Sequence, residues 1–291
     1  MKLNAIEPSQ QQQSSQSAAS LRWMRGLLLA LPLILLSELL FAEALLQILP
    51  TRMVLMDRER AGTLTLVNHG DLDTSYRMFF RNIKMSDTGE FQVITDQDDV
   101  SDERFADSML RFSPRRITIA ATGKQTIRIV ARKPQDLQPG EYRSHMVFRR
   151  LPNQESILDD GSRDNLTLSI QPVVEVTIPI IVRHGELDAS LSLSDAKLFE
   201  KDGERYLEVT INRSGQRSLY GNLKVSQKNQ SGETITLAQA KGISVYYPNS
   251  RRIFELPLQE PVAADSPLSI TFKEDESYGG SEQASININI D

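Results

Sequence analysis

One segment of the sequence alternates apolar and polar residues for much longer than an ordinary β-strand does. From Leu166 to Arg183 the chain reads LTLSIQPVVEVTIPIIVR, and all its even positions are apolar, counting Pro172 among them. This period of two predicts a β-strand, because successive side chains of a strand point to opposite faces of the sheet. At about 3.3 Å per residue it would extend roughly 60 Å, whereas a strand usually has about 5–6 residues. A long apolar strand promotes aggregation unless another strand pairs with it, so the surplus length requires an explanation.

Shorter alternating runs precede this segment. They predict strands at 52–56, 62–68, 75–85, 116–120, 125–132 and 140–150. The connections between them carry NHGD, SDTGE, ATGK and QPGE, which supply the Gly, Asn and Asp residues that turns favour. Together with the long run, these strands are typical of an immunoglobulin-like β-sandwich.

The alternation begins again after His184 in a second series of short runs, among them ASLSLSDAKLFE, RYLEVTINR, ISVYYP and ASININI. This series predicts a second, smaller β-sandwich, and only a few residues separate it from the first. We therefore expect an all-β chain of two immunoglobulin-like β-sandwich domains joined by a short hinge. The first domain would span 45–184 and the second 185–291.

The N-terminus has the pattern of an export signal. A polar tail rich in Gln and Ser is followed by LRWMRG, an apolar run at 26–36 and the small-x-small sequence Ala42-Glu43-Ala44. This order predicts that 1–44 is a tail and signal peptide, cleaved near Ala44, and that the mature chain is periplasmic. An uncleaved membrane anchor is the alternative, but a span needs about 20 apolar residues and this run is shorter. Translation could start at Met1 or at Met24.

Net charge and the absence of cysteine narrow the range of functions. The chain has 291 residues, a formal charge of −5 and 24% charged residues, without a basic stripe. Such a chain has no electrostatic basis for binding nucleic acid. An exported chain without cysteine gains nothing from disulfides, so its stability has to come from the size of its hydrophobic cores.

The sequence lacks the residue constellations of an enzyme or a metal site. His69, His145 and His184 are far apart, and we expect each to be structural or solvated. The acidic run from Asp96 to Glu103 lacks the ligand spacing of a calcium loop and is expected to be a solvated loop. A nucleophile elbow, a phosphate-binding loop and a His-Glu-x-x-His motif are absent too. We predict that the protein is not an enzyme and uses neither metal nor cofactor.

Three segments follow the motifs of one known family. The segment PTRMVLMDRERAGTLTLVN, at 50–68, has a Thr-Arg-hydrophobic start and an Asn sixteen residues after the Arg, here Arg52 and Asn68. At 112–129, FSPRRITIAATGKQTIRI contains Pro followed by alternating hydrophobic residues and then Gly-x-x-Gln-x-hydrophobic-Arg. At 137–152, LQPGEYRSHMVFRRLP closes with a Leu-Pro pair. In this order they resemble the PapD-like periplasmic chaperones of pilus assembly, whereas the second domain matches only as another short-strand sandwich after a brief hinge.

The resemblance implies a use for the surplus strand. In that family the seventh strand and its preceding loop are lent to an incomplete pilin subunit that lacks its own last strand, which is β-augmentation. Mapped onto this chain, Leu166, Leu168, Ile170 and Val174 would contact the subunit. The alternation alone suits an ordinary last strand, buried on one face, equally well.

The resemblance also implies an anchor for the subunit's C-terminal carboxylate. In the family an Arg on the first strand and a Lys on the seventh bind this group through charge-assisted hydrogen bonds. Arg52 occupies the Arg position, but the Lys position falls on Pro179. Either Arg183 or another basic residue replaces the Lys, or the anchor works differently. The implied partners are pilin or fimbrial subunits and an outer-membrane usher, without nucleic acid and without a membrane span after signal cleavage.

A two-domain structural or adhesive component of a surface fibre is the alternative function. Such a subunit should carry a free N-terminal donor strand or lack its last strand. The expected mature chain begins LLQILPTRMVL and runs almost directly into the first strand, which favours the chaperone.

The export signal generates the first prediction. The mature protein should begin at Leu45 and be recovered in the soluble periplasmic fraction, because the cleavage sequence ends at Ala44. N-terminal sequencing of the exported form measures this. Recovery of an intact 1–44 segment in the membrane fraction would replace the signal peptide with an anchor.

Overall fold

A computed structural model of the chain describes residues 46–95, 98–152, 173–259, 262–263 and 266–290. The predicted signal peptide, its cleavage site and three predicted subunit-binding residues (Leu166, Leu168 and Ile170) lie outside the described residues. The described residues all belong to one compact unit, 44–291. No helix among them is long and apolar enough to cross a membrane.

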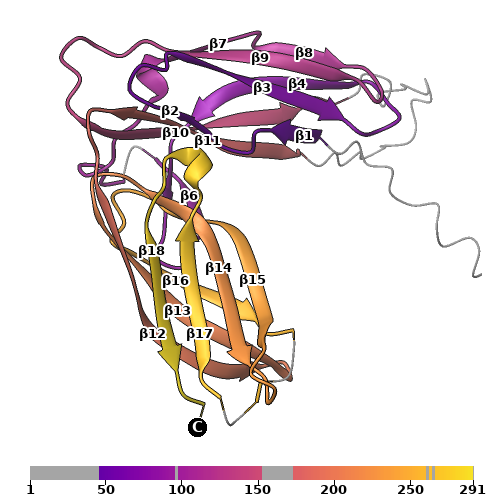
Figure 1. Cartoon of the computed structure of the whole chain (residues 1–291). Coiled ribbons are helices and arrows are strands. Elements are labelled where there is room, and N and C mark those ends of the chain that lie inside the picture. Colours follow the sequence, from indigo (N-terminus) through magenta and orange to yellow (C-terminus); the bar gives the residue numbers. More distant parts are fainter. Residues whose placement is uncertain (1–45, 96–97, 153–172, 260–261, 264–265, 291) are drawn as a thin grey trace, which may run out of the picture. The chain divides into compact units, whose positions relative to one another are not determined.

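The first half of the chain folds into two sheets that pack face to face (Figure 1). One sheet has the strand order β1-β3-β9-β7 and the other β2-β11-β10-β4-β8. The strands are β1 (Leu46–Leu49), β2 (Met53–Leu55), β3 (Ala61–Asn68), β4 (Thr74–Arg81), β7 (Leu110–Ser113), β8 (Arg116–Ile119), β9 (Lys124–Ala131), β10 (Gly140–Arg150) and β11 (Glu175–His184).

Alternate residues of these strands form one hydrophobic core, as the period of two predicts. Its fully or nearly buried members include Leu64, Leu66, Ile127, Ile129, Met146, Phe148, Ile178, Ile180 and Val182. Asn68 is buried at its edge, where its Nδ2 donates to the carbonyls of Leu72, Ile119 and Ala120. This side chain therefore holds two loops together, which is a structural role for one residue that carries the family resemblance.

The predicted strand at 52–56 is β2, and β1, which was not predicted from the sequence, precedes it in the other sheet. β1 pairs antiparallel with β3, and β2 pairs parallel with β11. Pro50, between them, has no N–H with which to continue a ladder. Arg52 therefore lies where the chain crosses from one sheet to the other.

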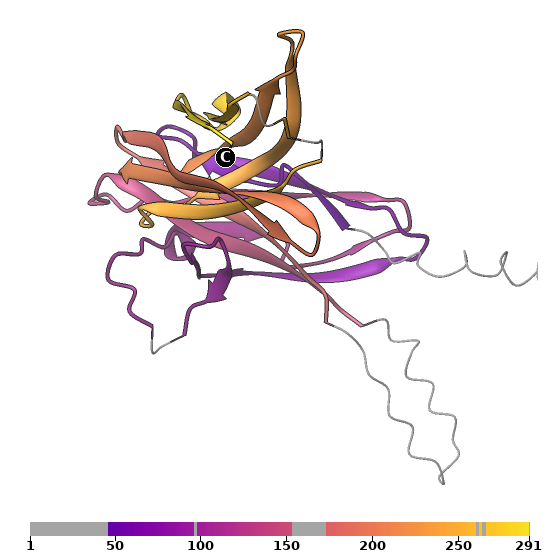
Figure 2. The same ribbon diagram turned by 90° about the horizontal axis from the view of Figure 1, so that it is seen from below.

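The sequence predicted one strand over 75–85, and this is wrong. β4 ends at Arg81, and the chain then enters a separate hairpin of β5 (Ile83–Met85) and β6 (Phe91–Val93). Asn82 lies between β4 and β5, where its side-chain oxygen accepts a hydrogen bond from Ser144 Oγ and its carbonyl accepts one from the Ile94 amide. Figure 2 shows the purple segment that includes β6 leaving the two sheets.

The second half forms another pair of sheets with a core of its own. Their orders are β12-β13-β16 and β15-β14-β17-β18. The strands are β12 (Ala189–Lys201), β13 (Glu204–Gly215), β14 (Leu219–Lys228), β15 (Thr234–Val245), β16 (Arg251–Pro257), β17 (Leu268–Glu274) and β18 (Gln283–Ile288). Two 3-10 helices, η1 (Asp107–Met109) and η3 (Glu276–Tyr278), are the helical elements among the described residues. The predicted all-β fold of two sandwiches is confirmed, while the domain bounds 45–184 and 185–291 stay a prediction.

A buried ion pair stands at the junction of the two sandwiches. Glu141 Oε2 accepts a hydrogen bond from Arg183 Nε at 2.9 Å and another from the Ser218 amide at 3.2 Å. Arg183 Nη1 also donates to the Tyr278 carbonyl at 2.7 Å. Burial alone would raise the pKa of Glu141, but Arg183 and the Ser218 hydroxyl outweigh burial and hold the pKa below its usual value.

This pair generates the second prediction. Glu141→Gln should lower the free energy of unfolding by about 3–5 kcal/mol, because it leaves the buried Arg183 charge uncompensated. Urea unfolding at neutral pH measures the loss. Glu200→Gln is the matched control, since Glu200 pairs with Arg205 at the surface and its loss should leave stability almost unchanged. Equal stability of the Glu141 variant and the wild type would contradict the prediction.

Candidate functional site

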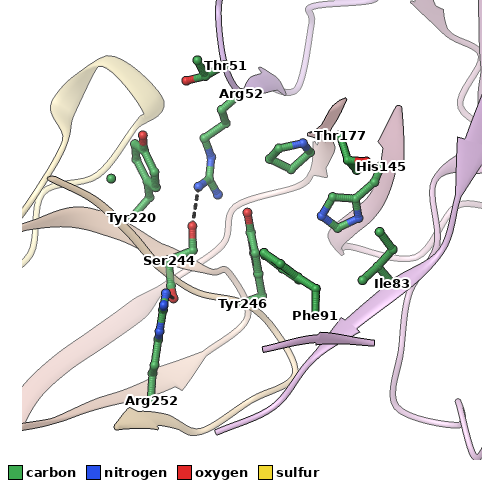
Figure 3. Close-up of a pocket in the computed structure, with 12 residues that line it drawn as sticks. Thr51, Arg52, Ile83, Phe91, His145, Thr177, Tyr220, Ser244, Tyr246 and Arg252 are labelled. Carbon is green, nitrogen blue, oxygen red and sulfur yellow. Dashed lines mark hydrogen bonds between the residues drawn. The ribbon is translucent and has the colours of Figure 1, made fainter. Parts of the chain in front are cut away.

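A pocket of about 400 Å³ lies between the two sandwiches (Figure 3). Residues from both halves of the chain line it, so the pocket forms only when the two sandwiches are packed together. The lining residues that matter below are Arg52, Phe91, His145 and Pro179 from the first half and Tyr246 and Arg252 from the second.

Arg52 is a buried cation with unused hydrogen-bond donors. Its side chain is 2% exposed, and Nη1 donates to Ser244 Oγ at 2.9 Å. Its guanidinium carbon lies 4.1 Å from the centre of the Tyr220 ring, which is a cation–π contact. Nε and Nη2 are buried and have no partner. Leaving donors of a charged group unpaired in a buried site is costly, so this geometry favours an anion in the pocket.

The other unpartnered atoms lie on groups around the same pocket. Among the described residues, every buried side-chain nitrogen or oxygen without a hydrogen bond belongs to Arg52, Arg143, His145 or Arg252. His145 and Arg252 line the pocket with Arg52, and the Arg143 guanidinium lies 4.0 Å from the centre of the Tyr246 ring. The site thus gathers three cations and an imidazole.

Burial shapes the charge state of these groups. It lowers the pKa of Arg143 and of Arg252 from the usual arginine value. Burial also lowers the pKa of His145 to about 3, and the nearby charges of Arg143 and Arg52 add to this effect. His145 is therefore neutral at physiological pH and presents one N–H donor, on a nitrogen set by the tautomer.

The predicted site residues are not all found together. Arg52 lines the pocket, as does Pro179 at the position of the family's lysine. Arg183 is absent from its lining residues and is engaged with Glu141 and the Tyr278 carbonyl. Val174, just before β11, is 41% exposed.

Part of the edge of β11 has no partner strand. β10 pairs with β11 along its whole length, but β2 covers only Ile180–Val182 on the other side. In the described part of the chain, Val173–Pro179 is therefore open on that side. The Arg150 amide donates to the Val174 carbonyl, so even-numbered residues bond toward β10. Because the ladder groups alternate, the backbone groups of Glu175 and Thr177 point to the open edge.

The burial of β11 decreases toward this open end. Ile178 and Ile180 are in the core, Val176 is partly buried against it, and Val174 is exposed. The sequence predicts a strand from Leu166; the part up to Pro172 lies outside the described residues, and β11 as described begins at Glu175. The Arg150 amide donates a hydrogen bond to the Val174 carbonyl, so pairing with β10 extends one residue before Glu175.

Sequence reasoning missed most of the pocket. It treated His145 as an isolated structural or solvated residue, and it assigned no role to Arg143, Tyr246 or Arg252. No local motif marks these positions, because strands far apart in the chain bring them together. The described residues include no group of three or more His, Cys, Asp or Glu side chains that could hold a metal ion.

Comparisons with known proteins add a structural likeness. No protein-family model and no curated protein matches the sequence. The chain is similar to the solved structure of the YadV chaperone, with 12% identity, coverage of 84% of this chain and 99% of that one, and a TM-score of 0.46. It is also similar to the E. coli chaperone DraB, with 14% identity, coverage of 85% and 97%, and a TM-score of 0.43.

A third similar structure is the CsuC–CsuE chaperone–tip adhesion subunit pre-assembly complex of Acinetobacter baumannii. Its identity is 14%, the coverage is 85% of this chain and 100% of that one, and the TM-score is 0.43. At such identities and TM-scores the likeness carries no argument about activity. What this chain does has to be inferred from its own residues.

His145 generates the third prediction. Its pKa is about 3 in the folded protein and 6.5 in the unfolded chain, so the unfolded state binds more protons between these values. The stability that neutral His145 contributes is lost as the pH falls from 6.5 toward 3. At pH 5 the loss should be about 2 kcal/mol relative to neutral pH. Urea unfolding at pH 7 and pH 5 should show this loss in the wild type and little of it in His145→Gln.

The buried carboxylates do not mimic the loss expected from His145. The pKa values of Glu141 and Glu274 are lowered from 4.5, so their losses begin below the range measured, whereas burial raises the pKa of Glu103, so its protonation in the folded state adds stability as the pH falls. His69→Gln, at an exposed histidine, is the matched substitution and is unfolded in urea at the same two pH values. An unchanged pH dependence in His145→Gln would show that His145 does not cause the acid loss.

Proposed function

We propose that this chain is a periplasmic chaperone that binds and stabilises fimbrial or pilus subunits by donor-strand complementation. One observation carries the proposal: Arg52 is buried with unpartnered guanidinium atoms in a pocket beside an unpaired strand edge. A polypeptide that ends in a carboxylate and pairs as a strand satisfies both features at once.

The carboxylate fits the chemistry of Arg52. Nε and Nη2 are free donors on adjacent corners of the guanidinium plane, the arrangement that binds a carboxylate through two parallel hydrogen bonds. No acidic residue is among the residues that line the pocket. A carboxylate of the bound subunit would supply the missing negative charge.

The strand edge determines the direction of the bound segment. If the subunit's C-terminus is at Arg52 and its last strand pairs with Thr177 and Glu175, that strand runs toward the pocket. β11 runs in the same sense, from Glu175 toward Pro179, so the two strands are parallel. Residues 166–174 would continue the pairing beyond the sandwich, with Leu166, Leu168, Ile170 and Val174 entering the subunit's groove.

The second cation of the anchor is Arg252 in this proposal, not Arg183. Arg183 neutralises Glu141, whereas Arg252 lines the pocket and has a buried Nε without a partner. Arg183 contributes indirectly, because it and Ser218 take hydrogen bonds of Glu141, to which Arg52 is attracted only electrostatically. Export, the family resemblance of the sequence and the absence of catalytic motifs agree with a chaperone that needs no cofactor and delivers subunits to an outer-membrane usher.

Arg52 generates the fourth prediction. Arg52→Met should weaken the binding of a strand peptide with a free C-terminal carboxylate by about ten- to a hundred-fold, because a charge-assisted hydrogen bond contributes roughly 1.5–3 kcal/mol. The probe is an acetylated peptide of alternating Thr and Val, measured by calorimetry as the free acid and as the C-terminal amide. The amide should bind the wild type as weakly as the acid binds Arg52→Met.

Two controls keep this result interpretable. Arg128→Ala removes an exposed arginine of β9 and should bind like the wild type. Thermal unfolding should show that Arg52→Met is folded. Methionine fills the space of the arginine side chain, and the charge that is removed lacks hydrogen bonds at Nε and Nη2. Equal affinities of the wild type and Arg52→Met for the acid would remove Arg52 from the site. The absence of any peptide binding by the wild type would favour a structural or adhesive fibre component.

A further inference from the structure

Aromatic and aliphatic side chains form the part of the pocket next to Arg52. Phe91, Ile83 and Tyr246 present rings or alkyl groups to it (Figure 3). Pro179 also lines the pocket. The Phe91 ring lies 5.7 Å from the His145 ring and 6.2 Å from the Tyr246 ring, measured between centroids. The pocket therefore offers more than a carboxylate site, since a carboxylate alone would leave this apolar space unfilled.

We propose that this space is a subsite for the last side chain of the bound polypeptide, and that it selects an apolar or aromatic residue there. The inference rests on the proposed function, because it assumes that Arg52 binds the terminal carboxylate. It adds the class of C-terminus that the protein accepts. Phe91 is the residue that determines this specificity.

The positions of the walls support a side chain at this place. Thr177 and Pro179 belong to the open edge of β11 and also line the pocket, so a strand paired there has its last residue at the pocket. Its carboxylate would face Arg52. The pocket volume of about 400 Å³ is within the range of about 300–1,000 Å³ that small ligands occupy, so it has room for one large side chain.

Phe91 is placed to contact that side chain. It is 58% exposed although its ring lines the pocket, and it belongs to the β5–β6 hairpin. An apolar occupant would cover part of this exposed ring and gain an aromatic contact.

The charges of the site oppose a basic last residue. Arg52 and Arg252 line the pocket, and no carboxylate lines it with them. A Lys side chain would enter a buried, positively charged space without a partner. The same cations that bind the terminal carboxylate therefore exclude C-termini that end in Lys or Arg.

The fifth prediction tests this selectivity with peptides that differ only in their last residue. Acetylated Thr-Val peptides ending in Phe, Leu, Gly or Lys, each as free acid, should bind the full mature protein in the order Phe and Leu, then Gly, then Lys. Phe91→Ala should weaken the binding of the Phe-ending peptide by about five- to thirty-fold and leave the binding of the Gly-ending peptide nearly unchanged. The difference between the two losses is the coupling between Phe91 and the last side chain.

Val93→Ala is the matched control. Val93 is on the same strand and is 53% exposed, but it is not among the residues that line the pocket. It should bind all four peptides like the wild type. Because Phe91 is largely exposed, Phe91→Ala should keep the wild-type thermal unfolding temperature. A lower unfolding temperature would show that a loss of binding comes from unfolding.

The outcomes separate this inference from the proposed function. Preference for free acid over amide, with equal affinity for all last residues, would keep the carboxylate site and overturn the subsite. Equal losses for the Phe-ending and Gly-ending peptides in Phe91→Ala would also overturn it. Equal binding of acid and amide would instead contradict the proposed function, whatever the last residue.

Discussion

The buried charge of Arg52 is the constraint on which the other features of the site depend. A guanidinium removed from water needs either a carboxylate or a full set of hydrogen bonds. Arg52 has one hydrogen bond to Ser244 and the face of Tyr220. Both partners belong to the second sandwich, so the charge is held in place only when the two sandwiches are joined. The second sandwich therefore helps to position Arg52 in the pocket.

Two buried carboxylates at the junction have their hydrogen bonds with groups other than Arg52, although the Arg52 charge still helps to lower the pKa of Glu141. Glu141 is paired with Arg183 and bonded to Ser218, and Glu274 receives two hydrogen bonds from Arg217, at 2.7 and 2.9 Å. These ion pairs stabilise the junction and neutralise its two buried carboxylates, Glu141 and Glu274. Arg143 has Glu103 at 3.7 Å, so the pocket cations without a carboxylate partner are Arg52 and Arg252, and an anion from outside is what they lack.

The sequence predicted the fold better than the site, for a physical reason. Strand alternation is local, so the strands around Ile127, Met146 and Ile180 could be located from the sequence. Arg52 was identified through its place in a motif. His145 and Arg252 could not be identified in this way, because they meet Arg52 through pairing between distant strands and through contacts between the sandwiches.

The exchange of roles between two arginines shows the same limit. The sequence offered Arg183 as a second anchor because it ends the long strand. Its side chain turns instead to Glu141, a residue of β10 in register with it. Which arginine serves the pocket depends on where the buried carboxylates are, and this is a property of the folded molecule. The hairpin that carries Phe91 was missed for a related reason, since 75–85 alternates like one strand.

In the proposed complex, Pro179 marks the point where strand pairing with a subunit has to stop. It is an odd-numbered residue of β11, so its missing N–H would have faced the open edge and not β10. From Ile180 onward β2 already occupies that edge. In the proposed complex a subunit strand can therefore pair at Glu175 and Thr177 but no further, and its end falls beside Arg52. The sequence resemblance aligns this proline with a lysine of the PapD-like chaperones; in the proposed complex the proline brings no charge but gives the ladder a defined end, where the C-terminal carboxylate would lie.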